Sequence, residues 1–353
     1  MAENIENRKS EHVEISLREN VNSHYNYWED VDLIHYSIPD TDLDNIDTTV
    51  SMFGKKLDYP IIIEGMTGGF ANAKKINENL GKAAEKLKIG MGVGSERAIF
   101  KHPENKDSYA VLKDLDIPLK ISNLGVPQLI AQKNIRPFNE ADIKKVMELI
   151  NADIIAFHLN YLQELVQPEG EHRSRGVLNR LSDIAQHYPV LAKETGAGVS
   201  KEMALALKRA GVIGIDVGGA GGTSFSAVEY YRAKSRADKK KEILGALFWD
   251  WGIPTPASIY SIRNIGLPVI GSGGVKTGLD IAKAIVLGAD AGGMARELLP
   301  YAAKSYESVM GRIEEIIYEL KATMFLVNAK NVRELQSKKF IVHGRTRDWI
   351  EKL

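Results

Sequence analysis

The sequence predicts a (β/α)₈ barrel, and two observations carry this prediction. From residue 60 on, short apolar or glycine-rich runs alternate with longer segments of helical period, which is the pattern of repeated βα units on a parallel sheet. Eight such runs lie within about 240 residues, and this is the size of a barrel of that kind. A doubly wound sheet is the alternative, but it usually has fewer strands. The strand count therefore favours the barrel.

Each predicted strand is a short run that ends at polar or glycine-rich residues. The eight strands are expected at 60–64, 89–93, 118–122, 153–157, 189–193, 212–216, 267–271 and 290–294. Most are followed by a helical pattern, such as NAKKINENLGKAAEKLK after the first strand. This order of strands and helices predicts that the barrel occupies residues 60–328.

Three further segments surround this regular pattern. Residues 1–59 are mostly polar and predict an irregular arm that lies against the barrel and closes over a substrate. Residues 218–260 form a long insertion after the sixth strand, and a connection of this length is usually a functional lid or disordered. Residues 329–353 are expected to form a C-terminal extension.

The composition excludes several classes of function. The 353-residue chain has 46 basic and 46 acidic residues, so no global charge attracts it to nucleic acid or to an anionic membrane. It has no cysteine, which excludes thiolate metal sites and cysteine nucleophiles. No window has the roughly 18 uninterrupted apolar residues of a membrane span, and the amino terminus has no apolar signal sequence. The expectation is a soluble, cytoplasmic protein.

The loops after strands seven and eight predict a phosphate site. They read SGGVKTG and GMARE, and loops at these two places of a barrel commonly bind phosphate through backbone N–H groups. Gly273 and Gly274 would let the chain approach an anion closely, and Lys276 and Arg296 could add positive charge. GGAGGTS, after strand six, would line the same side of the barrel mouth.

Lys193 points to a flavin as the phosphate-bearing cofactor. It ends the fifth strand, where a cation would suit the electron-rich N1–C2=O edge of a flavin. Asn123 and Ser95 end other strands and could hydrogen-bond a planar heteroaromatic ring. A Schiff-base lysine and a surface lysine are the alternatives for Lys193. No GxGxxG turn follows a strand, which argues against a nicotinamide as the main cofactor.

The stretch HLNYLQE brings four polar side chains to the end of the fourth strand. His158 and Asn160 share one face by the two-residue period of a strand, and Gln163 and Glu164 follow past its end. A buried polar group without a partner costs about 1–3 kcal/mol, so such a cluster is expected to hold a ligand. A satisfied core histidine is the alternative for His158 alone. No pair of acidic residues suited to acid–base catalysis is evident at the strand ends.

These motifs resemble the type 2, FMN-dependent isopentenyl-diphosphate isomerases. The resemblance covers almost the whole chain, through RKSEH (8–12), MTGG, GSER, NLG, HLNYLQE, KETGAG, GGAGGTS, WGIPT, SGGVKTG and ARELL. It implies a (β/α)₈ barrel that binds FMN and Mg²⁺, has its flavin reduced by NADPH, and interconverts isopentenyl and dimethylallyl diphosphate. It also implies a homo-oligomer, either a tetramer or an octamer.

The resemblance further implies roles for individual residues. The residues that match diphosphate or substrate contacts are Arg8, Lys9, Ser95, Arg97, His158, Asn160 and Gln163. Of these, Gln163 and His158 are the catalytic candidates. The residues that match flavin contacts are Met66, Thr67, Gly68, Ser95, Asn123, Lys193, Thr223, Gly273, Gly274, Lys276, Ala295 and Arg296. Glu164 matches the magnesium ligand. Arg8 and Lys9, read as an exposed pair, belong to an arm expected to become ordered when the diphosphate binds.

Two positions depart from the family pattern. Glu96 stands where the family more often has Gln, and an acid near a diphosphate would be repelled unless it is turned away or paired. Lys276 stands where Arg is common, which keeps the charge but loses a bidentate contact. Because no acidic pair is evident, the reduced flavin is the expected proton donor and acceptor, with its N5 region facing the substrate.

Other functions on the same barrel fit the residues less well. FMN-dependent 2-hydroxy-acid oxidases and dehydrogenases pair an active-site His with an Arg on the loop after a late strand, and here that loop reads GGAGGTS without His. An inosine-monophosphate-dehydrogenase-like enzyme needs a nucleophilic Cys. A flavin-binding scaffold without catalysis would not need Arg8, Lys9, Gln163 and Glu164 together.

Overall fold

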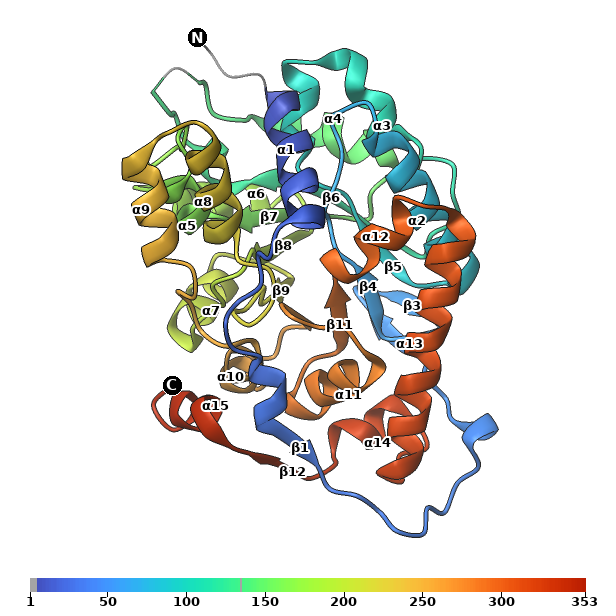
Figure 1. The fold of residues 1–353 in the computed structure, drawn as a ribbon. Helices are drawn as coiled ribbons and strands as arrows, with labels where there is room; N and C mark the ends of the chain where they lie inside the picture. Colours follow the sequence, from blue (N-terminus) through green and yellow to red (C-terminus); the bar gives the residue numbers. More distant parts are fainter. Residues whose placement is uncertain (1–4, 134) are drawn as a thin grey trace.

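The predicted barrel is confirmed in a computed structural model, which describes residues 5–133 and 135–353 (Figure 1). In these residues eight parallel strands close in the order β10-β11-β4-β5-β6-β7-β8-β9. Their bounds are β4 Ile61–Ile63, β5 Gly90–Gly92, β6 Leu119–Gly125, β7 Ile154–Leu159, β8 Val190–Glu194, β9 Gly214–Asp216, β10 Val269–Ser272 and β11 Ala291–Met294. Every strand overlaps the run from which it was predicted.

Helices surround the barrel, and several begin at the capping residues that the sequence provides. The α-helices after the amino-terminal segment are α2 Ala73–Leu87, α3 Asp107–Ala110, α4 Glu140–Ile150, α5 Tyr161–Val166, α6 Val177–Ala185, α7 Lys201–Arg209, α8 Phe225–Ser235, α9 Lys239–Leu247, α10 Thr255–Ile262, α11 Gly278–Leu287, α12 Leu299–Ala302, α13 Tyr306–Leu326, α14 Val332–Gln336 and α15 Gly344–Ile350. Thr277 and Asp280 form a capping box at the start of α11, which orients the loop that carries Gly273 and Gly274. Within the described part of the chain, each helix is too short or too polar to be a membrane span.

The amino-terminal segment is more regular than predicted. It contains the 14-residue helix α1, Ile5–Arg18, followed by β1 Val31–Leu33 and the antiparallel pair β2 Val50–Met52 and β3 Lys55–Leu57. Residues 1–4 of the predicted arm lie outside the described residues. The polar composition is that of a helix whose side chains hydrogen-bond to the rest of the protein, and it does not indicate a lack of structure.

The β2–β3 pair closes one end of the barrel. Met52 and Leu57 are buried and pack with inward-facing apolar side chains of the barrel strands, among them Ile62 and Ile121. Because Ile62 and Ile121 face the interior of the barrel, the β2–β3 pair fills the end of the barrel opposite the carboxyl ends of the strands. The mouth at the carboxyl ends is therefore the open end, as expected for this fold.

Strands near the two ends of the chain, β1 and β12 (Phe340–Val342), pair with each other at a distance from α1. β1 pairs antiparallel with β12, so the predicted C-terminal extension holds the amino-terminal segment in place. In Figure 1 this pair lies at the bottom of the view, whereas α1 lies across the upper part of the barrel. The residues between α1 and β1 therefore run along the molecule, away from the mouth of the barrel.

The predicted insertion at 218–260 is largely helical. It contains α8 and α9, which pack closely against each other, and α8 also contacts α1 and α5. Ala227 and Val228 of α8 are fully buried with Val21. The last residues of the predicted insertion already belong to α10, which packs on β10 and α11.

Candidate active site

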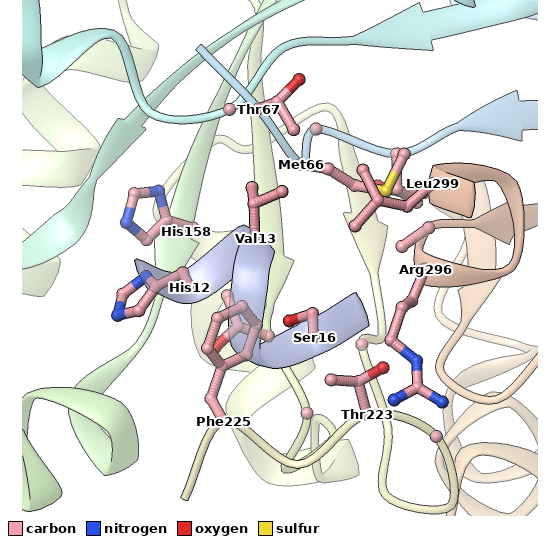
Figure 2. Close-up of a pocket in the computed structure, with 18 of the residues that line it drawn as sticks. His12, Val13, Ser16, Met66, Thr67, His158, Thr223, Phe225, Arg296 and Leu299 are labelled. Atoms are coloured by element: carbon pink, nitrogen blue, oxygen red, sulfur yellow. The ribbon is translucent and has the colours of Figure 1, made fainter. Parts of the chain in front are cut away.

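A cavity of about 630 Å³ opens at the carboxyl ends of the barrel strands, and α1 crosses it (Figure 2). It is lined by every residue that the sequence analysis named for a site. These residues are Arg8, Lys9, Met66, Thr67, Gly68, Ser95, Arg97, Asn123, His158, Asn160, Gln163, Glu164, Lys193, Thr223, Gly273, Gly274, Lys276, Ala295 and Arg296. The fold therefore brings together segments that are almost 290 residues apart in the sequence.

Lys9 enters the cavity from α1 and is not the exposed residue that was expected. Its ammonium group donates to Gly68 O at 2.9 Å, to Tyr109 Oη at 2.6 Å and to Ser95 O. Burial, and secondarily the charge of Arg8, lowers the pKa of Lys9 to about 7. All three partners are neutral oxygens, so no carboxylate contacts Lys9, and an anion that binds beside it would favour its charged form.

His158 faces the cavity from the end of β7. Its Nδ1 lies 2.7 Å from Asn123 Oδ1, which fixes the ring, and Figure 2 shows the ring beside α1. Burial, together with the nearby charges of Lys193 and Lys9, lowers the pKa of His158 to about 3. At neutral pH this imidazole is uncharged. Because Asn123 Oδ1 is an acceptor, Nδ1 carries the proton and Nε2 is left as an acceptor toward a ligand's donor or a water.

Glu164 lies in the first turn of α5 and is 3% exposed. Its Oε1 accepts from Asn160 Nδ2 at 3.1 Å, and its Oε2 accepts from Glu171 N at 2.7 Å and from Gln167. Burial raises its pKa. Asn160 Oδ1 is buried and has no hydrogen-bond partner, so these two residues are the ones that could offer oxygen atoms to a metal ion.

Gln163 belongs to a network that the sequence analysis did not identify. Its Nε2 donates to Glu229 Oε1 at 3.3 Å, and the same oxygen lies 2.8 Å from His12 Nε2. Arg232 NH1 donates to Glu229 Oε2 at 2.5 Å. Burial opposes ionisation of Glu229, but His12 and Arg232 outweigh it and lower the pKa to about 2. The network joins α1, α5 and α8.

One signal could have revealed His12. It follows Arg8 by four residues, which places both on the same face of a helix once RKSEH is read as helical. Glu229 could not be found in this way, because it lies 217 residues further on and its approach to α1 is set by the packing of α8.

Arg97 is committed to an acidic partner. Its guanidinium pairs with Glu171 through both terminal nitrogens, with NH1 at 3.1 Å from Oε2. Gln128 Nε2 also donates to this carboxylate, at 2.5 Å. An incoming anion would therefore meet Arg97 already paired, and Lys9 is the more available cation on that side of the cavity.

The glycine loops form a narrow cradle on the other side. Gly274 has φ +77°, and a Cβ there would lie 2.7 Å from Gly221 O. A Cβ on Gly222 would lie 2.3 Å from Gly274 N, so the two loops approach each other at backbone distance. Arg296 NH2 donates to Asn22 Oδ1 at 2.7 Å, whereas the Lys276 side chain is exposed at the rim.

Glu96 is turned away from the cavity, which answers the question raised by its sequence position. It is completely buried, and its Oε2 accepts from Ser122 Oγ and from Asn123 N, the latter at 3.0 Å. Its Oε1 has no partner. Burial raises its pKa to about 8.

Lys193 is paired with two carboxylates, which the sequence analysis did not identify at the strand ends. Its Nζ lies 2.6 Å from Glu64 Oε2 and 2.5 Å from Asp216 Oδ2. Glu64 follows β4 and Asp216 ends β9. Strands β10 and β11 lie between these two strands in the barrel, so residues far apart in the sequence meet across the mouth.

The fold defines the class of closed eight-stranded parallel barrels, with the cavity at the carboxyl ends of the strands. Residues 185–342 match the family model described as FMN-dependent dehydrogenase. A mandelate oxidase solved with a monooxide FMN adduct has the same fold, with a TM-score of 0.59 at 16% identity over 90% of both chains. A lactate oxidase of Pediococcus acidilactici gives 0.60 at 15% identity, over 90% of this chain and 84% of its own.

Curated relatives place the chain within this class. An isopentenyl-diphosphate delta-isomerase of Picrophilus torridus is 51% identical over 98% of this chain and 99% of its own. Those of Thermoplasma volcanium and Archaeoglobus fulgidus are 47% and 45% identical, each over 98% of this chain and over 99% and 98% of their own length. The chain belongs to the isopentenyl-diphosphate delta-isomerase family, and the resemblance recognised in its motifs is confirmed.

Proposed function

We propose that the chain interconverts isopentenyl and dimethylallyl diphosphate, using FMN and Mg²⁺, with NADPH as reductant of the flavin. The observation that carries this proposal is the single cavity, which joins a glycine cradle on one side to Lys9, His158 and Glu164 on the other. Such a cavity can hold a phosphate-bearing planar cofactor and a second anion together. The family membership supports the choice of substrate.

The glycine loops fit the phosphate of FMN. The close backbone approach at Gly222 and Gly274 leaves no room for side chains, and Arg296 lines the same part of the cavity. Lys193, Asn123 and Thr67 line the cavity between this cradle and β7, where they would hold the ring. When bound and reduced, the flavin would supply the group that gives and takes the substrate proton.

The substrate diphosphate would lie against α1 and β7. Lys9 would attract it, and the Asn160 amide group would donate to it. His158 Nε2 would accept from a water bound to it, and Gln163 would orient the alkene beside it. Val13, Phe225, Met66 and Leu299 are among the side chains that line the same cavity (Figure 2). These apolar side chains would exclude water that could trap a carbocation.

Mg²⁺ fits Glu164 because it usually combines one or two carboxylates with substrate phosphate oxygens and water. Among the described residues, no group of three or more acidic or histidine side chains could hold a metal alone. Glu164 and the unpartnered Asn160 Oδ1 would therefore supply the protein oxygens, and the substrate would supply the others.

The absorption spectrum of the purified protein with FMN, followed by an assay with isopentenyl diphosphate, Mg²⁺ and NADPH, tests the proposal. Turnover in deuterated water after a single reduction by dithionite should give dimethylallyl product that carries solvent deuterium. Consumption of one NADPH per product would contradict an isomerisation. Flavin binding without turnover would favour the non-catalytic scaffold instead.

A further inference from the structure

Glu64, Lys193 and Asp216 form a buried charge cluster at the ends of three barrel strands. Glu64 and Asp216 are 6% and 0% exposed, and the Lys193 ammonium contacts both carboxyl groups. Glu64 and Lys193 line the cavity, whereas Asp216 lies behind them. If both acids were ionised, the cluster would carry one net negative charge, and Lys193 would have little attraction left for a ligand.

The hydrogen bonds distinguish the two acids. Asp216 Oδ1 accepts from Ser272 Oγ and from Gly218 N, in addition to the Lys193 contact at Oδ2. Glu64 has Lys193 as its partner at Oε2, while its buried Oε1 has none and lies against Gly293. A buried carboxylate oxygen without a donor is costly, so the proton that two close carboxyls share belongs on Glu64.

The charges around Glu64 agree with this assignment. Burial is the largest influence, followed by the negative charge of Asp216, and together they outweigh Lys193 and raise the pKa of Glu64 to about 8. Ser272 of β10 and Gly293 of β11, the neighbours on the other side, are uncharged. At neutral pH the cluster is therefore an ammonium, a carboxylate and a carboxylic acid.

We propose that Glu64 is a positioning residue that keeps one proton, so that Lys193 remains free to attract negative charge on the edge of a bound flavin. This inference rests on the flavin site of the proposed function. A reduced flavin can lose its N1 proton and become an anion, whereas the oxidised ring is neutral. The protonated Glu64 would therefore favour the reduced, anionic cofactor selectively.

The proposal predicts a pH dependence that belongs to reduced FMN. Above about pH 8 Glu64 loses its proton, and two carboxylates then neutralise Lys193. Affinity for reduced FMN should fall about tenfold by pH 9, since binding must then restore the proton. Affinity for oxidised FMN should change little over the same range.

The test is a titration of the apoprotein with oxidised FMN and, anaerobically, with dithionite-reduced FMN from pH 7 to 9. Calorimetry in buffers of different ionisation enthalpy measures proton uptake on binding. Glu64→Gln, which is neutral at every pH, should abolish both the fall in affinity and the proton uptake. Asp216→Asn leaves a single carboxyl group beside Lys193, so its affinity for reduced FMN should stay level from pH 7 to pH 9. Glu297→Gln, a cavity carboxylate paired with Arg312, is the matched control and should behave as wild type.

The outcomes separate the two proposals. If wild type and Glu64→Gln bind both forms of FMN with the same pH dependence, the assignment of the proton to Glu64 is wrong and the flavin site stands. If no variant binds FMN in either state, the flavin site itself is wrong, and the inference falls with it. Should Glu64→Gln fail to fold, wild-type affinity that stays constant to pH 9, or a fall in affinity in Asp216→Asn as steep as in wild type, would still overturn the assignment.

Discussion

Replacing Glu96 by Gln should stabilise the protein at neutral and alkaline pH. The Gln carbonyl oxygen can accept the bonds that Ser122 and Asn123 now give to Oε2, and its amide group takes the place of the unpartnered Oε1. The substitution therefore keeps the contacts of Glu96 and removes only its ionisation. The charged group that acts on it, Lys9, is retained.

The magnitude follows from linkage between protonation and folding. Burial raises the pKa of Glu96 from 4.5 in the unfolded chain to about 8 in the folded protein. Stability from this group is therefore complete below pH 4.5 and is lost as the pH rises toward 8. Each pH unit inside this window costs about 1.4 kcal/mol, so wild type should lose about 3 kcal/mol between pH 5 and pH 7 that the Gln variant keeps.

Urea unfolding of the flavin-free protein, followed by tryptophan fluorescence from pH 5 to pH 8, measures this difference. Glu78→Gln is the control, because Glu78 is an exposed helix residue paired with Lys82. The stability difference between Glu96→Gln and wild type should grow with pH, whereas Glu78→Gln should follow wild type. Parallel curves for Glu96→Gln and wild type would refute the reasoning, since they would mean that Glu96 is ionised in both states.

Three further substitutions test the site. Glu164→Gln should require much more Mg²⁺ for turnover while FMN affinity stays the same, and an unchanged Mg²⁺ requirement would place the metal elsewhere. Lys193→Ala leaves Glu64 and Asp216 without their cation, so it should lower the free energy of unfolding by about 3 kcal/mol, as measured by urea unfolding. It should also weaken FMN binding at least tenfold, as measured by fluorescence titration. Arg232→Ala should release α1 from α8, seen as faster proteolysis within residues 5–18; proteolysis at the wild-type rate would show that other contacts hold the helix.

The barrel could be predicted from sequence because its signals are local. Each strand is a short run between turn residues, and the parallel order brings all the carboxyl ends to one mouth. Listing the polar residues at those ends was therefore enough to find cavity residues such as Asn123, whereas Arg8 and Lys9 of α1 were named only through the family resemblance. His158 and Lys193 needed no knowledge of their neighbours to be placed there.

The contacts across the mouth could not be predicted because they depend on partners far along the chain. Lys9 read as exposed, since nothing near it in the sequence reveals that Gly68 O and Tyr109 will receive its ammonium group. Glu64 and Asp216 likewise meet at Lys193 only because the barrel closes. The strands that carry these two acids are far apart in the sequence. The local sequence pattern predicts which charged side chains reach the mouth of the barrel. Which of these charges are paired with an opposite charge depends on the packing of distant segments.

The partners of the cavity cations indicate where its two anions would bind. Arg97 is paired with a carboxylate, which weakens its field at the cavity. Lys9 and Arg296 are held by neutral oxygens, from Ser95 and Tyr109 in one case and from Asn22 in the other. A cation fixed by neutral groups keeps its attraction for a ligand, and these two lie on the α1 side and the glycine-loop side of the cavity. The proposed reaction needs this separation, because the cofactor phosphate and the substrate diphosphate must be bound at once without repelling each other across the reacting alkene.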